Sequence, residues 1–359
     1  MQFGISVYPG LDNTAAENLY LIKLAAAQGV TRLFTSFHIP ETNISALKNE
    51  ISDLFALAKH LHLEIISDIS PETMKLLNIP TFKLSAFHIL GINTLRLDYG
   101  YGADEIAHLS RNRLGMRIQL NASTVTPRIL NDLILAKANF ENIDALHNFY
   151  PREGTGISEE TLVRKTAMLH KLGIKVGAFI PSQNRRRSPL RAGLPTLEMH
   201  REASVSLAVR HLAAIGIDSV FIGDSLPAEK ELSDLTTVVP DCVTLQAKFL
   251  TANKKIQDIL SNNTFTSRID EARDAVRSQE SRTIIKEAGL IIPPEKNITR
   301  LYGSVTIDNE KYARYMGELQ VLKRPQPADE RVNVVAQVHP DECFLTNYII
   351  PGKKFRFKF

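Results

Sequence analysis

Four acidic residues stand at or just after short β-rich runs, where they could serve as a general acid, a base or a nucleophile. They are Glu41, Asp68, Asp98 and Asp224. Hydrolysis of a glycosidic bond requires such a set, because one acid protonates the leaving oxygen while another carboxylate stabilises, activates or attacks the sugar. Asp68 and Asp224 are equally well suited to cap the helices expected after them, so they rank below Glu41 and Asp98 as catalytic candidates. These residues indicate a glycosidase or another acid–base enzyme.

The periodicity of β-strands ranks the two leading carboxylates. Arg96 and Asp98 are two positions apart in the run 94–98, so their side chains share one face of the strand, whereas leucines occupy the other face. Asp98 is therefore the first catalytic candidate, with a buried structural ion pair between Arg96 and Asp98 as the alternative. Glu41 is the second candidate because it follows a histidine and a proline-fixed turn.

Three consecutive arginines, Arg185–Arg187, lie in a long loop at 182–196. Phosphate sites of α/β barrels are often built from the loops after strands seven and eight. One guanidinium group can donate two parallel hydrogen bonds to a phosphate. We expect Arg152 and one or more of these arginines to hold a phosphate, with a solvated basic loop as the alternative for the others. The candidate ligand-binding residues are Tyr8, His38, Arg96, Asn121, His147, Asn148, Tyr150, Arg152, Arg185, Arg186 and Arg187.

Other chemistries have less support in the sequence. No H-E-x-x-H, phosphate-binding P-loop or dinucleotide-binding motif is present, and the His-x-His pair at 60–62 lies at the end of an expected helix. His38, His147 and Asp68 form the remaining set that could hold a metal. No lysine stands at the carboxyl end of an expected strand, which argues against a Schiff-base aldolase. We therefore expect neither a metal nor a cofactor.

These candidates must be positioned by a regular alternation of strands and helices. The β-rich runs of this part lie at 3–7, 32–36, 63–68, 94–98, 115–120, 143–147, 174–180 and 217–222. Eight strand–helix units in about 235 residues match a (β/α)8 barrel, whose active site lies at the carboxyl ends of its strands. A doubly wound open sheet is the alternative, but no G-x-G-x-x-G follows the first run.

The pattern changes after about residue 240. From residue 298 onward, β-rich runs separated by turn residues dominate. They lie at 301–307, 312–322, 332–338, 344–350 and 353–359. We therefore expect two domains, an α/β barrel over 1–237 that carries the catalytic site and a smaller β-rich domain over 240–359.

Composition excludes several classes of protein. The chain is 44% hydrophobic and 23% charged with a formal net charge of +4, values that are ordinary for a globular protein and too mild to indicate nucleic acid or a membrane surface as a partner. No apolar run is long enough to span a membrane, and the first residues do not read as a signal peptide. Two cysteines, Cys242 and Cys343, stand far apart. We expect a cytoplasmic protein without a disulfide scaffold, and whether it forms a homo-oligomer is left open.

Several segments together resemble one bacterial family. They are Phe3-Gly-Ile-Ser-Val-Tyr-Pro9, Leu33-Phe-Thr-Ser-Phe-His-Ile-Pro-Glu41, Leu95-Arg-Leu-Asp-Tyr-Gly100, Leu120-Asn-Ala-Ser-Thr124, His147-Asn-Phe-Tyr-Pro-Arg152, Gly193-Leu-Pro-Thr-Leu-Glu198, Thr306-Ile-Asp-Asn309 and Arg314-Tyr-Met-Gly-Glu-Leu-Gln320. The chain is similar over nearly its whole length to the 6-phospho-N-acetylmuramidases, long described as a domain of unknown function or "outer surface protein". The chain departs from the family pattern at 153–156 and at Ala192, in loops expected to shape the site.

The resemblance implies a fold and an activity. The fold is a (β/α)8 barrel followed by a cyclophilin-like β-barrel domain. The substrate is a phosphorylated amino-sugar disaccharide, N-acetylmuramic acid 6-phosphate joined to N-acetylglucosamine, which is hydrolysed in peptidoglycan recycling. Retaining, inverting and substrate-assisted routes all remain open. A sugar-phosphate isomerase or epimerase on the same barrel, and a non-enzymatic phosphosugar-binding protein, are the alternative functions.

Overall fold

The chain divides into two compact units. The computed structural model describes residues 1–36, 39, 42–69, 82–97, 100–295 and 297–359. The first unit comprises Met1–Leu212 and Gly216–Val238, and the second comprises Ala213–Ile215 and Val239–Phe359. Within the described ranges, none of the helices combines the length and the apolarity that crossing a bilayer requires.

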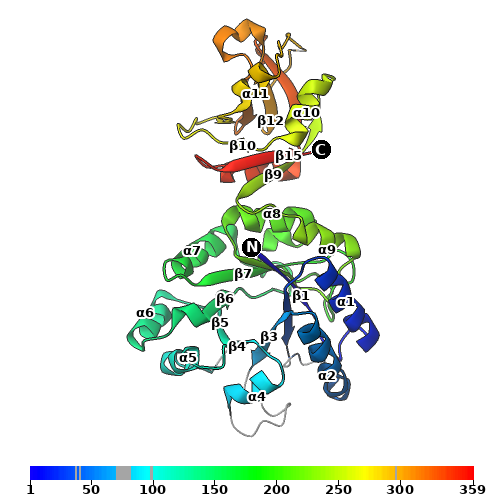
Figure 1. Ribbon diagram of the computed structural model, residues 1–359, viewed down its shortest axis with the longest axis vertical. Helices are drawn as coiled ribbons and strands as arrows, with labels where there is room; N and C mark the ends of the chain where they lie inside the picture. The colour runs from blue at the N-terminus through cyan, green and yellow to red at the C-terminus, as the bar shows by residue number, and fades with distance from the viewer. Residues whose placement is uncertain (37–38, 40–41, 70–81, 98–99, 296) are drawn as a thin grey trace. The chain divides into compact units, whose positions relative to one another are not determined.

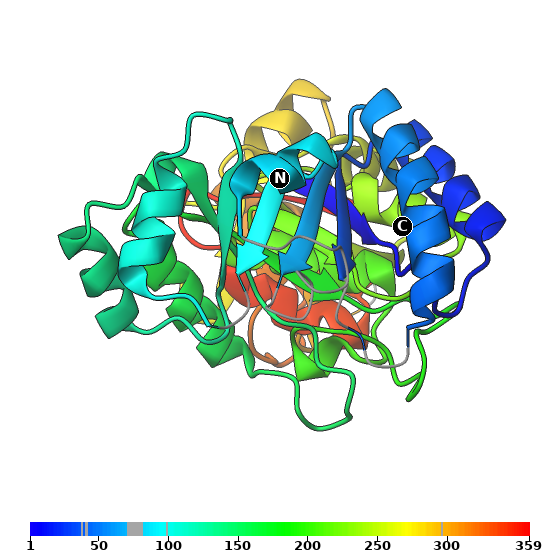
Figure 2. The same ribbon diagram turned by 90° about the horizontal axis from the view of Figure 1, so that it is seen from below.

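The described part of the first unit contains eight parallel strands that close into a barrel in sequence order. The strands are β1 (Gln2–Ser6), β2 (Arg32–Ser36), β3 (Glu64–Ile69), β4 (Thr94–Leu97), β5 (Arg117–Asn121), β6 (Ile143–Leu146), β7 (Lys175–Ile180) and β8 (Ser219–Ile222). The helices are α1 (Ala15–Ala27), α2 (Ile44–His60), α4 (Leu84–Ile89), α5 (Ala103–Ser110), α6 (Pro127–Leu135), α7 (Glu159–His170), α8 (Val205–Ile215) and α9 (Glu229–Thr236), with short 3-10 helices η1 (Phe140–Asn142) and η2 (Glu198–His200). Figure 1 shows the helices arranged around the strands, and Figure 2 shows strands from the side with their arrowheads toward one end. The predicted (β/α)8 barrel is confirmed.

Local sequence signals start the helices of this barrel. The hydroxyl of Thr14 accepts from the backbone N–H of Glu17, and the Glu17 carboxylate accepts from the backbone N–H of Thr14, which forms a capping box before α1. Thr126 caps α6, which begins with Pro127. The Ser158 hydroxyl caps α7. Such caps satisfy backbone donors that a helix cannot satisfy by itself.

The interior of the barrel is closed at its amino end by a polar network. Arg32 is 3% exposed, and its Nη2 lies 2.9 Å from Glu64 Oε1 and 2.8 Å from Asp144 Oδ2. The Gln119 amide donates to Asp144 Oδ1 at 3.0 Å. Apolar side chains form the next cluster, made of Tyr8, Phe34, Ile66, Leu146, Phe179, Leu194 and Phe221. The barrel interior is therefore a filled core, and the active sites of such barrels lie at the carboxyl end of the strands.

The described part of the second unit contains a seven-stranded sheet with the order β10-β15-β9-β14-β12-β13-β11. Its strands are β9 (Cys242–Phe249), β10 (Phe265–Thr266), β11 (Ala275–Arg277), β12 (Ser304–Asp308), β13 (Leu319–Leu322), β14 (Val332–Val338) and β15 (Lys354–Lys358). Its helices are α10 (Lys254–Asn262), α11 (Ser281–Glu287), and the 3-10 helices η3 (Glu310–Tyr315) and η4 (Pro340–Tyr348). The pairing is antiparallel except between β15 and β9. The smaller β-rich domain is confirmed, and its mixed sheet is compatible with the cyclophilin-like fold that the resemblance implies.

Two of the β-rich runs expected in this domain are partly helical. In the run 344–350, residues 344–348 belong to η4, which begins with Pro340 and carries Asp341 and Glu342 in its first turn. Proline and acidic residues favour the start of a helix, and they outweighed the β-forming residues that follow. The run 312–322 begins in η3 and becomes a strand only at Leu319.

Candidate active site

Three polar side chains from different parts of the barrel meet at the carboxyl end of the strands. Arg96 Nη1 on β4 lies 2.7 Å from Asp68 Oδ1 on β3, and Arg96 Nη2 donates to Asn148 Oδ1 after β6. Asp68 is 6% exposed and Arg96 is 3% exposed. Separating the two members of a buried ion pair would leave each charge without compensation, which is energetically costly. The ion pair with Asp68 therefore holds the Arg96 guanidinium in place across the mouth of the barrel. Arg96 thus lies on the inner face, as the strand periodicity predicts.

Arg187 places a second buried guanidinium at the mouth of the barrel. Its Cζ lies 4.9 Å from the ring centroid of Tyr8, after β1, and 4.9 Å from that of Phe149, after β6. The side chain is 8% exposed, and no described residue accepts a hydrogen bond from its guanidinium. Ring faces attract a cation but do not satisfy its N–H donors. The guanidinium therefore presents positively charged N–H donors that no described residue uses, and such donors can bind an anion.

Asp224 fixes the loop that carries Arg187. Its carboxylate accepts hydrogen bonds from the backbone N–H groups of Arg187 at 2.9 Å, Ser182 at 2.9 Å and Leu194 at 3.2 Å. The residue is fully buried, and burial raises the pKa of this carboxyl although the three N–H groups oppose the rise. With its oxygens engaged by the backbone, Asp224 has the contacts of a positioning residue, and the catalytic role expected from the sequence stays a prediction.

The other arginines of the expected phosphate site are engaged elsewhere or exposed. Arg185 Nη1 lies 2.9 Å from Glu17 Oε1, and Arg186 Nη2 lies 2.9 Å from Glu202 Oε2. The side chain of Arg152 is exposed. Both neighbours of Arg187 have a carboxylate partner. Arg187 is the buried member of the three, and its guanidinium has no hydrogen-bond acceptor among the described residues.

Glu198 and Arg201 join the loops after β6 and β7. The carboxylate and guanidinium form two hydrogen bonds of 2.7 Å, which lower the pKa of Glu198 to about 2. Arg201 also donates to four carbonyl oxygens, those of Tyr150, Arg152, Ala192 and Gly193, at 3.0–3.1 Å. The Glu198 carboxylate accepts from the backbone N–H groups of Gly154 and Gly156 at 2.9 and 2.6 Å.

Sequence reasoning assigned no role to this pair. The structure shows the constraint at Gly156, where a Cβ would lie 2.6 Å from Glu198 Oε2 and 2.7 Å from the Glu198 backbone nitrogen. Only glycine allows the two loops to approach so closely. The pair therefore fixes the backbone around Tyr150, one of the expected ligand-binding residues.

The remaining described candidates are structural neighbours of this mouth. The Tyr8 hydroxyl donates to the Gly223 carbonyl at 2.7 Å, and burial raises its pKa to about 12. Asn121, at the end of β5, is 6% exposed, and its Oδ1 accepts from the Ser123 backbone N–H at 3.0 Å. Both residues border the site, and these bonds fix their side chains.

His147 directly follows β6 and contacts the loop after β5. Its Nδ1 is 3.1 Å from the Ser123 hydroxyl oxygen, which itself accepts from the Asn148 backbone N–H at 2.9 Å. The ring is fully buried, and burial, with Lys165 and Arg96 nearby, lowers its pKa to about 3. His147 is thus a neutral imidazole that supports the loop after β5.

Three expected site residues, His38, Glu41 and Asp98, lie outside the described residues. The two leading catalytic carboxylates are among them, so their assignment stays a prediction. In the part of the chain that the structure describes, no group of three or more His, Cys, Asp or Glu side chains could hold a metal ion.

Models of one protein family together match nearly the whole chain, and two solved structures are similar to all of it. The sequence model described as "6-phospho-N-acetylmuramidase, N-terminal" matches residues 3–237, and its C-terminal counterpart matches residues 243–358. No curated protein matches the chain. An uncharacterized B. cereus protein of known structure is 29% identical over 100% of this chain and 99% of its own, with a TM-score of 0.90. A conserved Enterococcus faecalis protein with an unknown function is 34% identical over 100% and 96% of the two chains, with a TM-score of 0.73.

Proposed function

Because the chain belongs to the 6-phospho-N-acetylmuramidase family of glycosidases, we propose that it hydrolyses the bond between N-acetylmuramic acid 6-phosphate and N-acetylglucosamine in peptidoglycan recycling. A sugar that carries a 6-phosphate is expected inside the cell, so a cytoplasmic location is part of this proposal. The barrel mouth is the site at which the reaction would take place, since barrel enzymes act at the carboxyl ends of their strands.

The observation that carries the proposal is the unpartnered guanidinium of Arg187. A buried cation without an acceptor is costly for the folded protein, and a phosphate supplies both the charge and the oxygens that it lacks. The ring faces of Tyr8 and Phe149 hold the guanidinium in place before the ligand arrives. We assign Arg187 to the 6-phosphate for this reason.

The polar chain across the mouth supplies the second half of a sugar site. Arg96 is oriented by Asp68, and Asn148 presents an amide beside it. These groups can bind sugar hydroxyls, the acetamido group or the lactyl carboxylate of the substrate. Asp68 and Asp224 are each held by other groups, which leaves Asp98 and Glu41 as the proposed general acid and its carboxylate partner.

The test measures release of N-acetylglucosamine from the disaccharide with and without its 6-phosphate. The native chain should strongly prefer the phosphorylated disaccharide. A charge-assisted hydrogen bond is worth about 1.5–3 kcal/mol, so Arg187→Ala should lose about 10- to 150-fold in kcat/KM on this substrate. Arg187→Ala should keep its rate on the unphosphorylated one.

Arg185→Ala is the matched control, because Arg185 lies in the same loop but pairs with Glu17 at the surface. It should behave as the native chain does. Equal turnover of both disaccharides by the native chain would contradict the phosphate assignment. Isomerisation of a sugar phosphate without release of a reducing sugar would favour an isomerase instead.

A further inference from the structure

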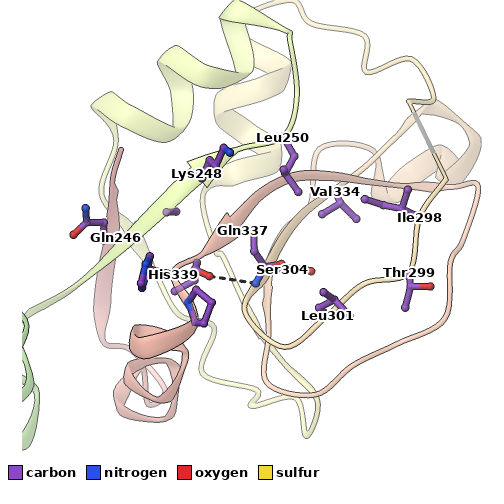
Figure 3. Close-up of a pocket in the computed structure, with 13 residues that line it drawn as sticks. Gln246, Lys248, Leu250, Ile298, Thr299, Leu301, Ser304, Val334, Gln337 and His339 are labelled. Atoms are coloured by element: carbon purple, nitrogen blue, oxygen red, sulfur yellow. Dashed lines mark hydrogen bonds between the residues drawn. The ribbon is translucent and has the colours of Figure 1, made fainter.

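The second unit contains a cavity whose lining residues all belong to that unit. It has a volume of about 430 Å³ and lies over β9, β12 and β14, beside the segment 298–301 (Figure 3). This volume falls in the range of small-molecule sites. Figure 3 shows Leu250, Val334 and Ile298 along one side and Leu301 along the other.

The walls of this cavity are apolar and accessible. Leu250 is 49% exposed and Leu301 is 57% exposed, although both border a recess rather than a flat surface. Val334 and Val338 also line the cavity and are buried. A ligand that covered the two leucines would remove apolar surface from water, which favours binding by about 25 cal/mol for each Å².

The polar groups in the floor are satisfied by one another. The Ser304 hydroxyl donates to Gln337 Oε1 at 2.9 Å, which is the dashed line in Figure 3, and Gln337 Nε2 donates to the Tyr302 carbonyl at 2.8 Å. The Ser304 hydroxyl and the Gln337 amide therefore offer no free donor to a ligand, and most of the remaining lining is apolar, which favours an apolar ligand body.

Charge is present at one point of the border. Lys248 is exposed and is adjacent to Gln337 in the β9–β14 pairing, so its ammonium group can reach over the recess. No described carboxylate pairs with Lys248, and the described lining contains no acidic residue. The other ionisable lining residue, His339, already faces Asp341 at 3.7 Å. The lone cation favours an anionic head group on the ligand.

We propose that this cavity binds a small amphipathic carboxylate, with its apolar body between Leu250 and Leu301 and its carboxylate at Lys248. This proposal rests on residues of the second unit and does not depend on the reaction proposed for the barrel. Octanoate is the probe, and octylamine is its counterpart with the same apolar chain and the opposite charge.

Calorimetric titration of the full chain tests the proposal. Octanoate should bind once per chain and more tightly than octylamine. Lys248→Gln keeps the aliphatic stem and removes the charge, so it should weaken octanoate binding by about fivefold, the effect of an exposed ionic contact, and leave octylamine binding no weaker. Leu301→Trp should fill the recess and abolish binding of both probes. Lys254→Gln, on α10 and outside the cavity lining, is the matched control and should bind as the native chain does.

Three results would overturn the proposal. They are equal affinity for octanoate and octylamine in the native chain, native binding by a folded Leu301→Trp variant, and the same loss in Lys248→Gln and Lys254→Gln. The alternative occupant of the recess is a second copy of the chain, which sedimentation tests. If the native chain sediments as a dimer, Leu301→Asp dissociates that dimer and octanoate does not bind, the recess is a contact between two copies of the chain. Because Lys248 is exposed, its variant tests the carboxylate even if a Leu301 variant does not fold.

Discussion

The Glu198 carboxylate and the Arg201 guanidinium meet through two hydrogen bonds of 2.7 Å and tie together the loops after β6 and β7. The backbone N–H group of Gly156 donates to the same carboxylate at 2.6 Å. The loops that carry Phe149 and Arg187 therefore behave as one rigid border of the barrel mouth.

Gly156→Ala should disrupt this border. The added Cβ would lie within 2.8 Å of three atoms of Glu198, two of them backbone atoms, so the loops must separate. Overpacking of this kind costs about 1–3 kcal/mol. We expect a lower melting temperature of the barrel and a higher KM for the phosphorylated disaccharide. Gly102→Ala is the control, since no atom lies within 4 Å of a Cβ at that position, and equal effects of both variants would contradict this account.

Inorganic phosphate should stabilise the barrel through Arg187 without any turnover. A ligand that binds only the folded state at about 100 times its Kd adds about 2.7 kcal/mol to the free energy of unfolding. The melting temperature of the native chain and of Arg185→Ala should rise with phosphate, and that of Arg187→Ala should rise much less. The same phosphate-dependent rise in all three proteins would place the anion elsewhere.

Asp98→Asn and Glu41→Gln should each lower kcat on the phosphorylated disaccharide by about 10²–10⁴-fold, the usual cost of losing a general acid or base. Circular dichroism checks that each variant is folded. Near-native turnover by both folded variants would exclude the pair as the catalytic carboxylates.

Asp308 should make the second unit less stable as the pH rises. It is 4% exposed, and burial, followed by the nearby Glu318 carboxylate, raises its pKa to about 7. The folded state therefore holds this proton more tightly than the unfolded chain does, and the free energy of unfolding falls between about pH 4 and pH 7. Asp308→Asn should raise the melting temperature at pH 8 and change it little at pH 4.

Asp329 provides a control of opposite sign. Hydrogen bonds from Arg331 lower its pKa to about 2, so its ionised form stabilises the folded state. Asp329→Asn should lower the melting temperature at pH 8. If both variants shift stability in the same direction at this pH, the charge argument is wrong.

The barrel could be predicted because its signals are local. Alternating strand and helix patterns and helix caps each depend on neighbours in sequence, and the strand periodicity placed Arg96 on the inner face. The run 344–350 was assigned wrongly because it contains β-forming residues, and the helix start at Pro340 lies before it.

The candidate site could be predicted only in outline. Arg185, Arg186 and Arg187 have the same chemistry and adjacent positions, so nothing in the local sequence distinguishes them. The distinction comes from Tyr8 and Phe149, which approach Arg187 only in the folded barrel. Asp224 likewise looks catalytic by its place at a strand end, whereas its contacts with three backbone N–H groups depend on the path of a long loop.

The network of Arg32, Glu64 and Asp144 at the amino end of the barrel determines how substrate and products can reach and leave the interior of the barrel. With that end sealed, the mouth is both the way in and the way out. In the proposed reaction, the disaccharide enters and the two monosaccharides leave by this same opening. The phosphorylated product should dissociate last, because its charge is bound at this end of the barrel. At high concentration it should therefore inhibit the enzyme by competing with the substrate.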